Sequence, residues 1–448
     1  MKNILIIGAG LSTYNLVEYL KEQASLRDWK IVIADKSIET AKLRANSHPN
    51  VKATSLDVSD DSKRKELISA ADVVVSMLPA HMHTIVAEDC ILEKKHMVTA
   101  SYISKEMKDL NSAAINAGSI ILNEIGLDPG IDHLSAKKVL DKIKIEGGKM
   151  LIFESFTGGL LAPQSDTNPW NYKFTWNPRN VVLAGSGAAV KFKQEGLYKY
   201  IPYHQLFRRT EPIYIDGYGS FEGYANRDSL GYRDVYGLED IPTIFRGTLR
   251  KPGFCRSWDV FVKLGMTDDS YCLENSENMS HRDFTNTFLA YNPNDSVELK
   301  LMHYLNIPQD SDLIAKLDWL GMFSSKKVGI KNASPAQILQ HILEQKWSLE
   351  PDDKDMIVMY HKFGYEINGQ KKMLESSMVT EGKSQQDTAM ARTVGLPVAI
   401  AVKQIMIGNI KTPGVQIPIS QEIYEPMLEE LEEFGIRFIE KEIEYKGY

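Results

Sequence analysis

The chain has 448 residues, of which 43% are hydrophobic, and its formal net charge is -7. This length allows large buried cores and predicts two or three domains, while the acidic balance argues against a concentrated basic face for nucleic acid or an anionic membrane. Cys90, Cys255 and Cys272 show neither CxxC spacing nor a neighbouring histidine cluster, so we expect a cytoplasmic protein without a disulfide framework or bound metal. A strand-like run opens the sequence and no apolar stretch approaches the roughly 20 residues that cross a bilayer, so we expect neither a signal peptide nor a membrane span.

Apolar runs alternate with segments of helical periodicity through about residue 125. The runs are "KNILIIG", "WKIVIAD", "VKATSLDVSD", "ADVVVSMLP", "KKHMVTAS" and "GSIILNEIG". Continuous apolar runs are typical of strands covered on both faces, and alternation with helices is typical of βα units. The pattern predicts a six-stranded, mostly parallel, doubly wound sheet of the Rossmann type, which binds ligands beyond the carboxyl ends of its strands.

A glycine turn, "GAGLST", follows the first run. Gly8 permits a tight turn, and Gly10 lets the backbone approach a pyrophosphate at the start of the next helix. The third position of the dinucleotide fingerprint is Thr13 rather than Gly or Ala, and a purely structural glycine turn is the alternative. We expect a dinucleotide to contact Gly8, Gly10, Leu11 and Ser12.

Acidic residues end the second and third runs. Asp35 stands where an acid binds the adenosine ribose hydroxyls and repels a 2′-phosphate, which slightly favours NAD over NADP, although Lys36 could bind that phosphate. Asp57 is either an adenine contact or the cap of the next helix. Leu78 and Pro79, which end the fourth run, are expected near the middle of the cofactor.

Five separated motifs resemble one known family. They are "EIGLDPGIDHL", "SFTGGLLAPQSDTNPWNYKFTW", "YANRDSL", "RGTLR" and "MARTVGLPVAIAVK", which look like those of saccharopine reductase, the L-glutamate-forming saccharopine dehydrogenase. The resemblance implies a Rossmann domain over residues 1–127. It also implies an α/β substrate-binding and dimerisation domain with a small helical portion over 128–385, and a segment over 386–448 that returns to the first domain. A homodimer is implied.

The resemblance also implies the reaction. Glutamate and 2-aminoadipate 6-semialdehyde condense to an imine, which takes a hydride from a nicotinamide cofactor to give saccharopine, in lysine metabolism. Fungal members typically use NADP(H), in conflict with the interpretation of Asp35. Two alternatives stay open: a related reductive-amination enzyme such as carboxynorspermidine synthase, and a sensor that binds NAD(P) without catalysis.

Seven of the fourteen arginines lie between Arg208 and Arg256. Arginine binds carboxylates with two hydrogen bonds and keeps its charge, so this cluster suits a substrate with several carboxylates. By similarity, Arg227, Thr248 and Arg250 bind substrate carboxylates. For Arg208, Arg209, Arg233 and Arg256, pairing with nearby acids on a solvated surface is the favoured interpretation. Thr157 stands where family members commonly have Cys, and its hydroxyl can still bind a carboxylate, while Arg179 is placed near the cofactor by family analogy.

Three residues are expected at the chemistry itself. In the family the pair at Ser101 and Tyr102 touches substrate, and the residue at Asp128 contacts both substrate and cofactor. Asp128 and Tyr102 are candidates for proton transfer during imine formation and hydrolysis, and the sequence does not assign acid or base. His133 is either a proton shuttle or a satisfied structural residue, and the structural interpretation is favoured.

Overall fold

The computed structural model describes residues 2–308 and 311–447, and its chain divides into two compact units. The first unit comprises Met1–Met150, Val235–Gly237 and Tyr365–Ile443. The second comprises Leu151–Asp234, Leu238–Gly364 and Glu444–Tyr448. The three domains expected from the sequence, over residues 1–127, 128–385 and 386–448, stay a prediction, because this division into two units does not test them.

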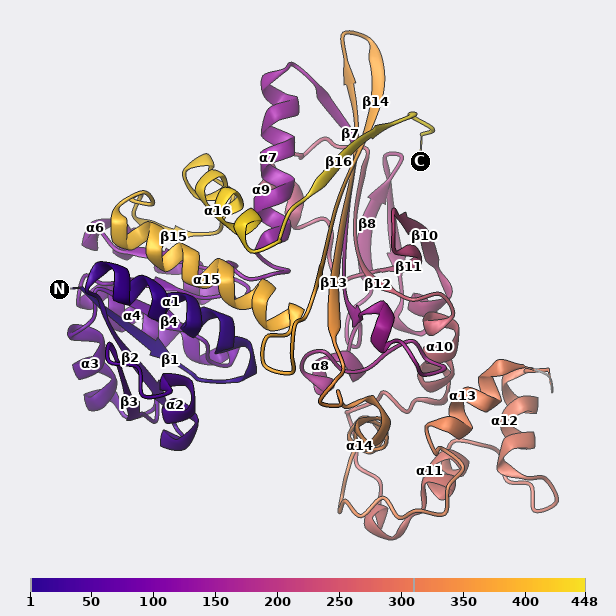
Figure 1. Ribbon diagram of the computed structural model, residues 1–448. Helices are drawn as coiled ribbons and strands as arrows, with labels where there is room; N and C mark the ends of the chain where they lie inside the picture. Colours follow the sequence, from indigo (N-terminus) through magenta and orange to yellow (C-terminus); the bar gives the residue numbers. More distant parts are fainter. Residues whose placement is uncertain (1, 309–310, 448) are drawn as a thin grey trace. The chain divides into compact units, whose positions relative to one another are not determined.

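A parallel sheet of seven strands forms the centre of the first unit, in the order β15-β6-β5-β4-β1-β2-β3 (Figure 1). Six strands match the predicted runs: β1 (Asn3–Ile7), β2 (Lys30–Asp35), β3 (Val51–Ser55), β4 (Val73–Ser76), β5 (His96–Val98) and β6 (Ile120–Leu122). The predicted doubly wound fold is therefore confirmed. A seventh strand, β15 (Gly414–Gln416), joins β6 in parallel from the far end of the chain.

Helices connect these strands: α1 (Tyr14–Arg27), α2 (Ile38–Ala45), α3 (Asp61–Ser69), α4 (His83–Leu92), α5 (Lys105–Asp109) and α6 (Asn111–Ala117). Helix α15 (Ala389–Ile407) lies beside α1 (Figure 1). A Cβ at Gly395 would come within 2.9 Å of the Ser12 carbonyl, so glycine permits this close approach. Helix α15 is long and apolar enough to cross a bilayer, but it is mostly buried, as expected of a core helix.

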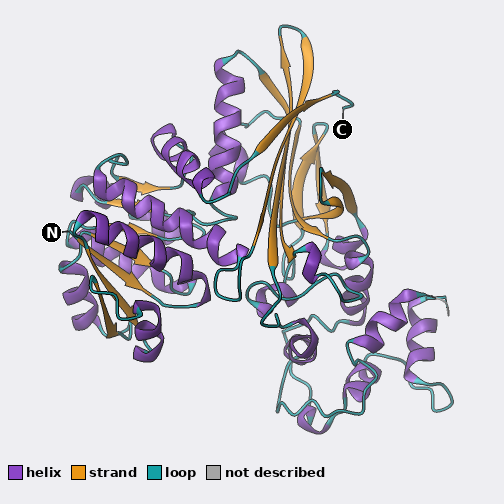
Figure 2. Cartoon of the chain, in the orientation of Figure 1, coloured by secondary structure: helices purple, strands orange, loops and turns teal. Residues whose placement is uncertain are grey.

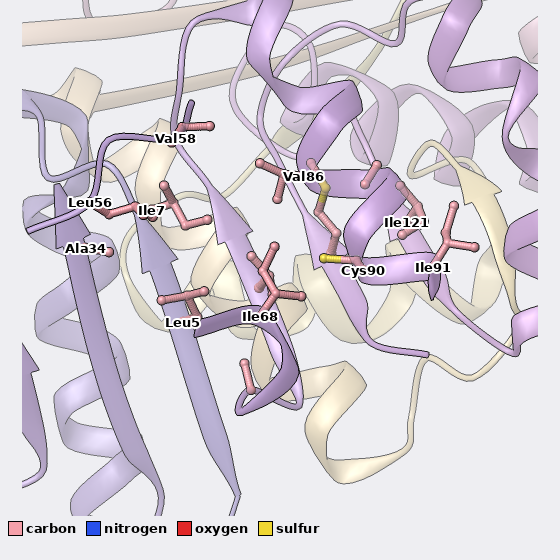
Figure 3. Packing of buried hydrophobic residues seen from close by; sticks show 14 of the residues in the cluster. Leu5, Ile7, Ala34, Leu56, Val58, Ile68, Val86, Cys90, Ile91 and Ile121 are labelled. Atoms are coloured by element: carbon pink, nitrogen blue, oxygen red, sulfur yellow. The ribbon is translucent and has the colours of Figure 1, made fainter. Parts of the chain in front are cut away.

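The core of this unit packs side chains from strands and helices against one another (Figure 3). Leu5 and Ile7 of β1 lie in one cluster with Val86 and Cys90 of α4 and Ile121 of β6. Burial of such side chains contributes about 1.5–3 kcal/mol each. The carboxyl ends of the strands are thereby held in a fixed array.

The remaining elements of the first unit follow the sheet or come from the end of the chain. They are α7 (Ile131–Ile145), α16 (Gln421–Glu433), β14 (Gln370–Glu381) and β16 (Ile439–Ile443). Strand β14 pairs antiparallel with β16. Helix α7 begins directly after the turn that carries Asp128, so the end of the sheet and the first turn of this helix frame that residue.

The second unit is built on a mixed sheet with helices. Its strands are β7 (Lys149–Leu161), β8 (Val190–Gln194), β9 (Leu197–Ile201), β10 (Thr210–Ile215), β11 (Gly219–Ala225), β12 (Thr243–Arg250) and β13 (Asp355–Ile367). Strand β12 runs parallel to β7 and antiparallel to β11. This arrangement confirms the predicted second α/β domain.

Helices accompany the strands of the second unit, and most of them lie between residues 254 and 347. Figure 2 draws the helices of the chain in purple and its strands in orange. They are α8 (Pro178–Val182), α9 (Tyr232–Tyr236), α10 (Phe254–Leu264), α11 (His281–Thr287), α12 (Val297–Leu305), α13 (Asp312–Trp319) and α14 (Pro335–Trp347). Trp170, Trp258 and Trp347 are fully buried: Trp170 stacks with Phe261, Trp258 stacks with Phe254, and Trp347 stacks with Trp258. These aromatic rings therefore serve packing.

Candidate active site

The glycine turn has the geometry that a tight β-to-α connection requires. Gly8 has φ +100°, and a Cβ there would lie 2.6 Å from the Met77 carbonyl oxygen, so only glycine fits. A Cβ at Gly10 would meet nothing within 4 Å, which leaves open space on that side of the turn. Thr13, at the third fingerprint position, is buried, and its hydroxyl donates to the Gly10 carbonyl at 2.6 Å. Threonine therefore closes the turn instead of contacting a ligand.

Asp35 is engaged by the backbone. One carboxylate oxygen accepts from the Ala9 N–H at 2.8 Å and the other accepts from the Ser37 N–H at 2.9 Å. These bonds tie the glycine turn to the end of β2. These bonds fix the orientation of the carboxylate and favour its charged form, so a 2′-phosphate at this position would need a cation from another residue.

Asp57 is tied to its own turn. Its carboxylate accepts from the Ser59 N–H at 3.0 Å and the Ser59 hydroxyl at 2.6 Å, and it pairs with Lys36 at 3.2 Å. These hydrogen bonds, chiefly those from Ser59, lower the pKa of Asp57 to about 2. The turn at the end of β3 is therefore built around an ionised carboxylate.

Arg44 on α2 contacts the glycine turn and was missed by the sequence reasoning. Its Nε donates to the Ala9 carbonyl at 3.3 Å, its Nη2 donates to the Gly10 carbonyl at 3.1 Å, and its guanidinium lies 5.8 Å from the centre of the Tyr14 ring. No local motif marks this arginine, because its contacts depend on how α2 packs. It places a permanent positive charge beside the expected cofactor turn.

A buried chain of three side chains extends from the end of β4. Ser76 Oγ lies 2.8 Å from His83 Nδ1, and His83 Nε2 lies 2.7 Å from Ser101 Oγ. Burial lowers the pKa of His83 to about 4, so the imidazole is neutral near neutral pH. Leu78, close by, packs its side chain against the core, and Pro79 precedes a short 3-10 helix.

Glu124 and His133 of the "NEIGLDPGIDHL" turn are paired with each other. Glu124 accepts from the Ile103 N–H at 2.9 Å and lies 2.8 Å from His133 Nε2, while His133 Nδ1 lies 2.8 Å from the Tyr236 hydroxyl. The Glu124 N–H donates to the Ser101 carbonyl at 3.0 Å. Glu124 thus holds the segment Ser101–Ile103 at two points, and His133 is a buried structural residue.

Asp128 and Tyr102 lie together, as expected. The Tyr102 hydroxyl donates to Asp128 Oδ1 at 3.3 Å, and 39% of Tyr102 is exposed. Asp132 is instead buried and accepts from the Gly130 N–H at 2.6 Å, so it caps the turn before α7. The turn therefore separates one structural acid from one partly accessible acid that a substrate amine could reach.

In the second unit, Thr157 and Thr248 stand opposite each other on β7 and β12. The Thr157 hydroxyl is buried and has no hydrogen-bond partner within the described part of the chain. A buried hydroxyl without a partner costs about 1–3 kcal/mol, so such a group calls for a ligand. Thr248 also neighbours Tyr224 of β11 across the sheet.

Arg250, at the end of β12, is buried among aromatic rings. Its guanidinium lies 5.0 Å from the centre of the Tyr172 ring, 5.3 Å from that of Phe254 and 5.8 Å from that of Tyr224. Its Nη1 donates to the Leu249 carbonyl at 2.9 Å, but its Nε has no partner, and it forms no ion pair with any described carboxylate. Glu222 stands opposite Arg250 on β11 and its charge acts on the guanidinium without forming an ion pair, so a ligand carboxylate can still bind the unpaired Nε.

The other predicted arginines differ from Arg250. Arg208 pairs with Asp259 at 3.1 Å and Arg256 with Asp312 at 3.8 Å, so acids further along the chain supply their partners. Arg179 forms an ion pair with Asp269, and its role at the cofactor stays a prediction. Arg227 is exposed and follows β11 in a left-handed conformation, with φ +46°.

The residue types that hold metals are dispersed. Over residues 2–308 and 311–447, no group of three or more His, Cys, Asp or Glu side chains could hold a metal ion. Cys90, Cys255 and Cys272 are free thiols. The described geometry therefore offers a dinucleotide turn with a nearby acid–phenol pair in the first unit, and a carboxylate-binding group in the second.

Comparisons with known proteins agree with this geometry. Residues 4–122 match the family model described as "Saccharopine dehydrogenase NADP binding domain", and residues 126–436 match "Saccharopine dehydrogenase C-terminal domain". The chain is 34% identical to "Saccharopine dehydrogenase [NADP(+), L-glutamate-forming]" of Schizosaccharomyces pombe, with 99% of both chains covered. It is 32% identical to the mitochondrial alpha-aminoadipic semialdehyde synthase of Rattus norvegicus, covering 98% of this chain and 47% of that protein.

A solved structure agrees over the whole fold. The apo saccharopine dehydrogenase (L-Glu forming) from Saccharomyces cerevisiae has a TM-score of 0.90 and 34% sequence identity, with 99% of this chain and 100% of that chain covered.

Proposed function

Because the chain belongs to the saccharopine dehydrogenase family, we propose that it interconverts saccharopine with L-glutamate and 2-aminoadipate 6-semialdehyde, using NADP(H), in lysine metabolism. The observation that carries the proposal is Arg250, a buried guanidinium whose Nε has no hydrogen-bond partner and which forms no ion pair among the described residues. Saccharopine brings three carboxylates, and one of them supplies the missing charge.

The groups around Arg250 suit a carboxylate. The planar fork of arginine binds two carboxylate oxygens at once, and the surrounding rings exclude water, which strengthens the pairing. Thr157, whose buried hydroxyl lacks a partner, can donate a further hydrogen bond on the same sheet. Arg227 and Thr248 are proposed as additional carboxylate contacts on the similarity of their motifs.

The chemistry needs a proton donor and acceptor at the substrate amine. NADP+ accepts the hydride from saccharopine, and the protein's own groups bind, orient and exchange protons. The Asp128 carboxylate can pair with the secondary ammonium group, and the Tyr102 hydroxyl, which already donates to Asp128, can pass a proton between this carboxylate and the amine. We propose these two residues as the acid–base pair.

We favour NADP(H) over NAD(H), which reverses the slight preference drawn from Asp35. Both Asp35 oxygens accept backbone N–H groups, and Arg44 places its guanidinium on the carbonyls of the same turn. A fixed cation beside the ribose end of the turn suits a 2′-phosphate. The printed descriptions of the matched NADP binding domain and of the fungal relatives support the same choice.

Turnover of saccharopine tests the reaction. Purified protein with saccharopine and NADP+ should produce reduced cofactor and glutamate in equal amounts. Lysine and 2-oxoglutarate as products would contradict the assignment, and so would turnover of carboxynorspermidine in place of saccharopine. Cofactor binding without turnover of any amino acid would indicate a sensor.

Removing one positive charge from α2 tests whether the protein prefers NADP+ to NAD+. We expect Arg44→Ala to raise the KM for NADP+ about tenfold or more, since a charge-assisted contact contributes about 1.5–3 kcal/mol, while the KM for NAD+ changes little. Lys42→Ala removes the same charge from an exposed position of the same helix and is the matched control. Equal effects on NADP+ and NAD+ would remove Arg44 from the phosphate site.

The homodimer and the cytoplasmic location are proposals carried over from the family and from the cysteine content. Sedimentation at several protein concentrations measures the oligomeric state. Localisation of the tagged protein in its native cell measures the compartment.

A further inference from the structure

We infer that His83 is a positioning residue which fixes the hydroxyl of Ser101 as a hydrogen-bond donor, so that Ser101 binds a substrate carboxylate. The inference rests on the proposed function, in which Ser101 touches substrate. It adds a residue that no motif assigns, and its basis is the buried chain Ser76–His83–Ser101, with contacts of 2.8 Å and 2.7 Å.

The buried end of the chain sets the tautomer of the imidazole. Ser76 Oγ is fully buried, and His83 Nδ1 is its side-chain partner within the described residues. A hydroxyl has one hydrogen to donate, and leaving it without an acceptor costs about 1–3 kcal/mol. Ser76 therefore donates to Nδ1. Because the imidazole is neutral, its one hydrogen then lies on Nε2.

The tautomer in turn sets the role of Ser101. The Nε2–H donates to Ser101 Oγ, so this oxygen accepts one bond from the protein and its own hydrogen remains for a ligand. The opposite tautomer would draw the Ser101 hydrogen onto Nε2 and leave only an acceptor, which suits an ammonium group. The observed chain thus selects a ligand that accepts hydrogen bonds, and a carboxylate of the amino-acid substrate is that ligand.

The backbone of Ser101 is held independently, so the side-chain effect can be separated from loop order. The Ser101 carbonyl accepts from the Glu124 N–H at 3.0 Å, and the Ser101 N–H donates to Thr99 Oγ1 at 3.3 Å. Neither bond involves His83. Replacing His83 should therefore leave the loop in place and release the rotation of one hydroxyl.

Two substitutions of His83 separate the roles of its two ring nitrogens, because each keeps a polar group near only one of the two serines. His83→Asn keeps an amide near Ser76 but does not reach Ser101, whereas His83→Gln extends an amide N–H to Ser101. We expect His83→Asn to raise the KM for saccharopine about tenfold, and His83→Gln to restore it to within roughly threefold of the native value. The kcat and the Kd for NADP+ should stay within about twofold. His81→Gln, at an exposed neighbouring histidine, is the control.

A double substitution tests whether His83 acts through Ser101. Combined with Ser101→Ala, His83→Asn should add nothing to the increase in KM caused by Ser101→Ala alone. Multiplication of the two effects, or an unchanged KM in His83→Asn, would overturn the inference while leaving the proposed reaction intact. An unchanged KM in Ser101→Ala would also overturn it.

The tautomer is measurable without any turnover. Two-bond ¹⁵N–¹H correlation spectra of the imidazole should show His83 protonated on Nε2 in the native protein, and a mixture of tautomers in Ser76→Ala. A proton on Nδ1 in the native protein would overturn the inference even in an active enzyme. Absence of saccharopine turnover together with the Nε2–H form would instead reject the proposed function and retain the donor assignment of Ser101.

Discussion

Arg250→Lys keeps the positive charge at the end of β12 and removes the planar fork. In the native side chain Nη1 is committed to the Leu249 carbonyl, so Nε and Nη2 remain for a ligand, and Nε is buried without a partner. These two nitrogens can hold both oxygens of one carboxylate. A lysine ammonium in the same space keeps one of the two bonds.

The expected loss is that of one charge-assisted hydrogen bond in a site closed by Tyr172, Phe254 and Tyr224. Such a bond contributes about 1.5–3 kcal/mol, which corresponds to an increase of roughly 10- to 150-fold in the KM for saccharopine. The Kd for NADP+ should change far less, because, among the described residues, Arg250 makes no hydrogen bond or ring contact with the glycine turn that is expected to hold the cofactor.

Steady-state kinetics with saccharopine as the varied substrate measure the effect, and urea unfolding checks that the variant folds. Arg256→Lys is the matched control, since Arg256 is exposed and its partner Asp312 lies at 3.8 Å. A KM within twofold of the native value in a folded variant would show that Arg250 does not hold a carboxylate. The site would then have to be sought elsewhere.

Three further predictions concern stability. Gly8→Ala should destabilise the first unit by ~1–3 kcal/mol in urea unfolding, because the new Cβ meets the Met77 carbonyl and φ is unfavourable for alanine. Arg64→Met should lower the free energy of unfolding by ~3–5 kcal/mol, because it leaves the buried carboxylate of Asp89, which lies 2.7 Å from Arg64 Nε, without its partner. If Arg64→Met lost less stability than the double variant Arg64→Met/Asp89→Leu, this reasoning would be contradicted. Burial lowers the pKa of His83 from 6.5 to about 4 on folding, so between these pH values the unfolded chain binds more protons than the folded chain. The free energy of unfolding should therefore decrease as the pH falls from 6.5 to 4. His83→Asn should make this decrease smaller by ~1–3 kcal/mol, and an unaltered decrease would refute the reasoning.

The sequence was sufficient where a local pattern has a local cause. Apolar runs separated by helical periodicity predicted all six strands from β1 to β6, and the conformation of Gly8 follows from the sharp turn between a strand and a helix. The five motifs predicted the family. Paired assignments such as Tyr102 with Asp128 followed from that resemblance, and the hydrogen bond between them agrees with it.

The sequence was insufficient where a side chain's partner lies far along the chain. The position of Asp35 predicted a ribose ligand, which stays a prediction, but it did not reveal that the carboxylate also accepts from the N–H of Ala9, 26 residues earlier. The arginine that contacts the glycine turn carries no motif, and the seventh strand, β15, comes from beyond residue 410.

The amino-acid order by itself determined where the backbone turns, which runs are buried and which chemical groups the chain carries, because φ preferences and hydrophobic periodicity act over a few residues. The tertiary structure decided which of those groups are satisfied and which remain available to a ligand. Through packing and strand register alone, His83 reaches Ser101 across 18 residues, and Arg250 keeps an Nε without a hydrogen-bond partner among the described residues. The burial of each polar group is set by the whole fold, and with it the difference between a structural residue and one that awaits substrate.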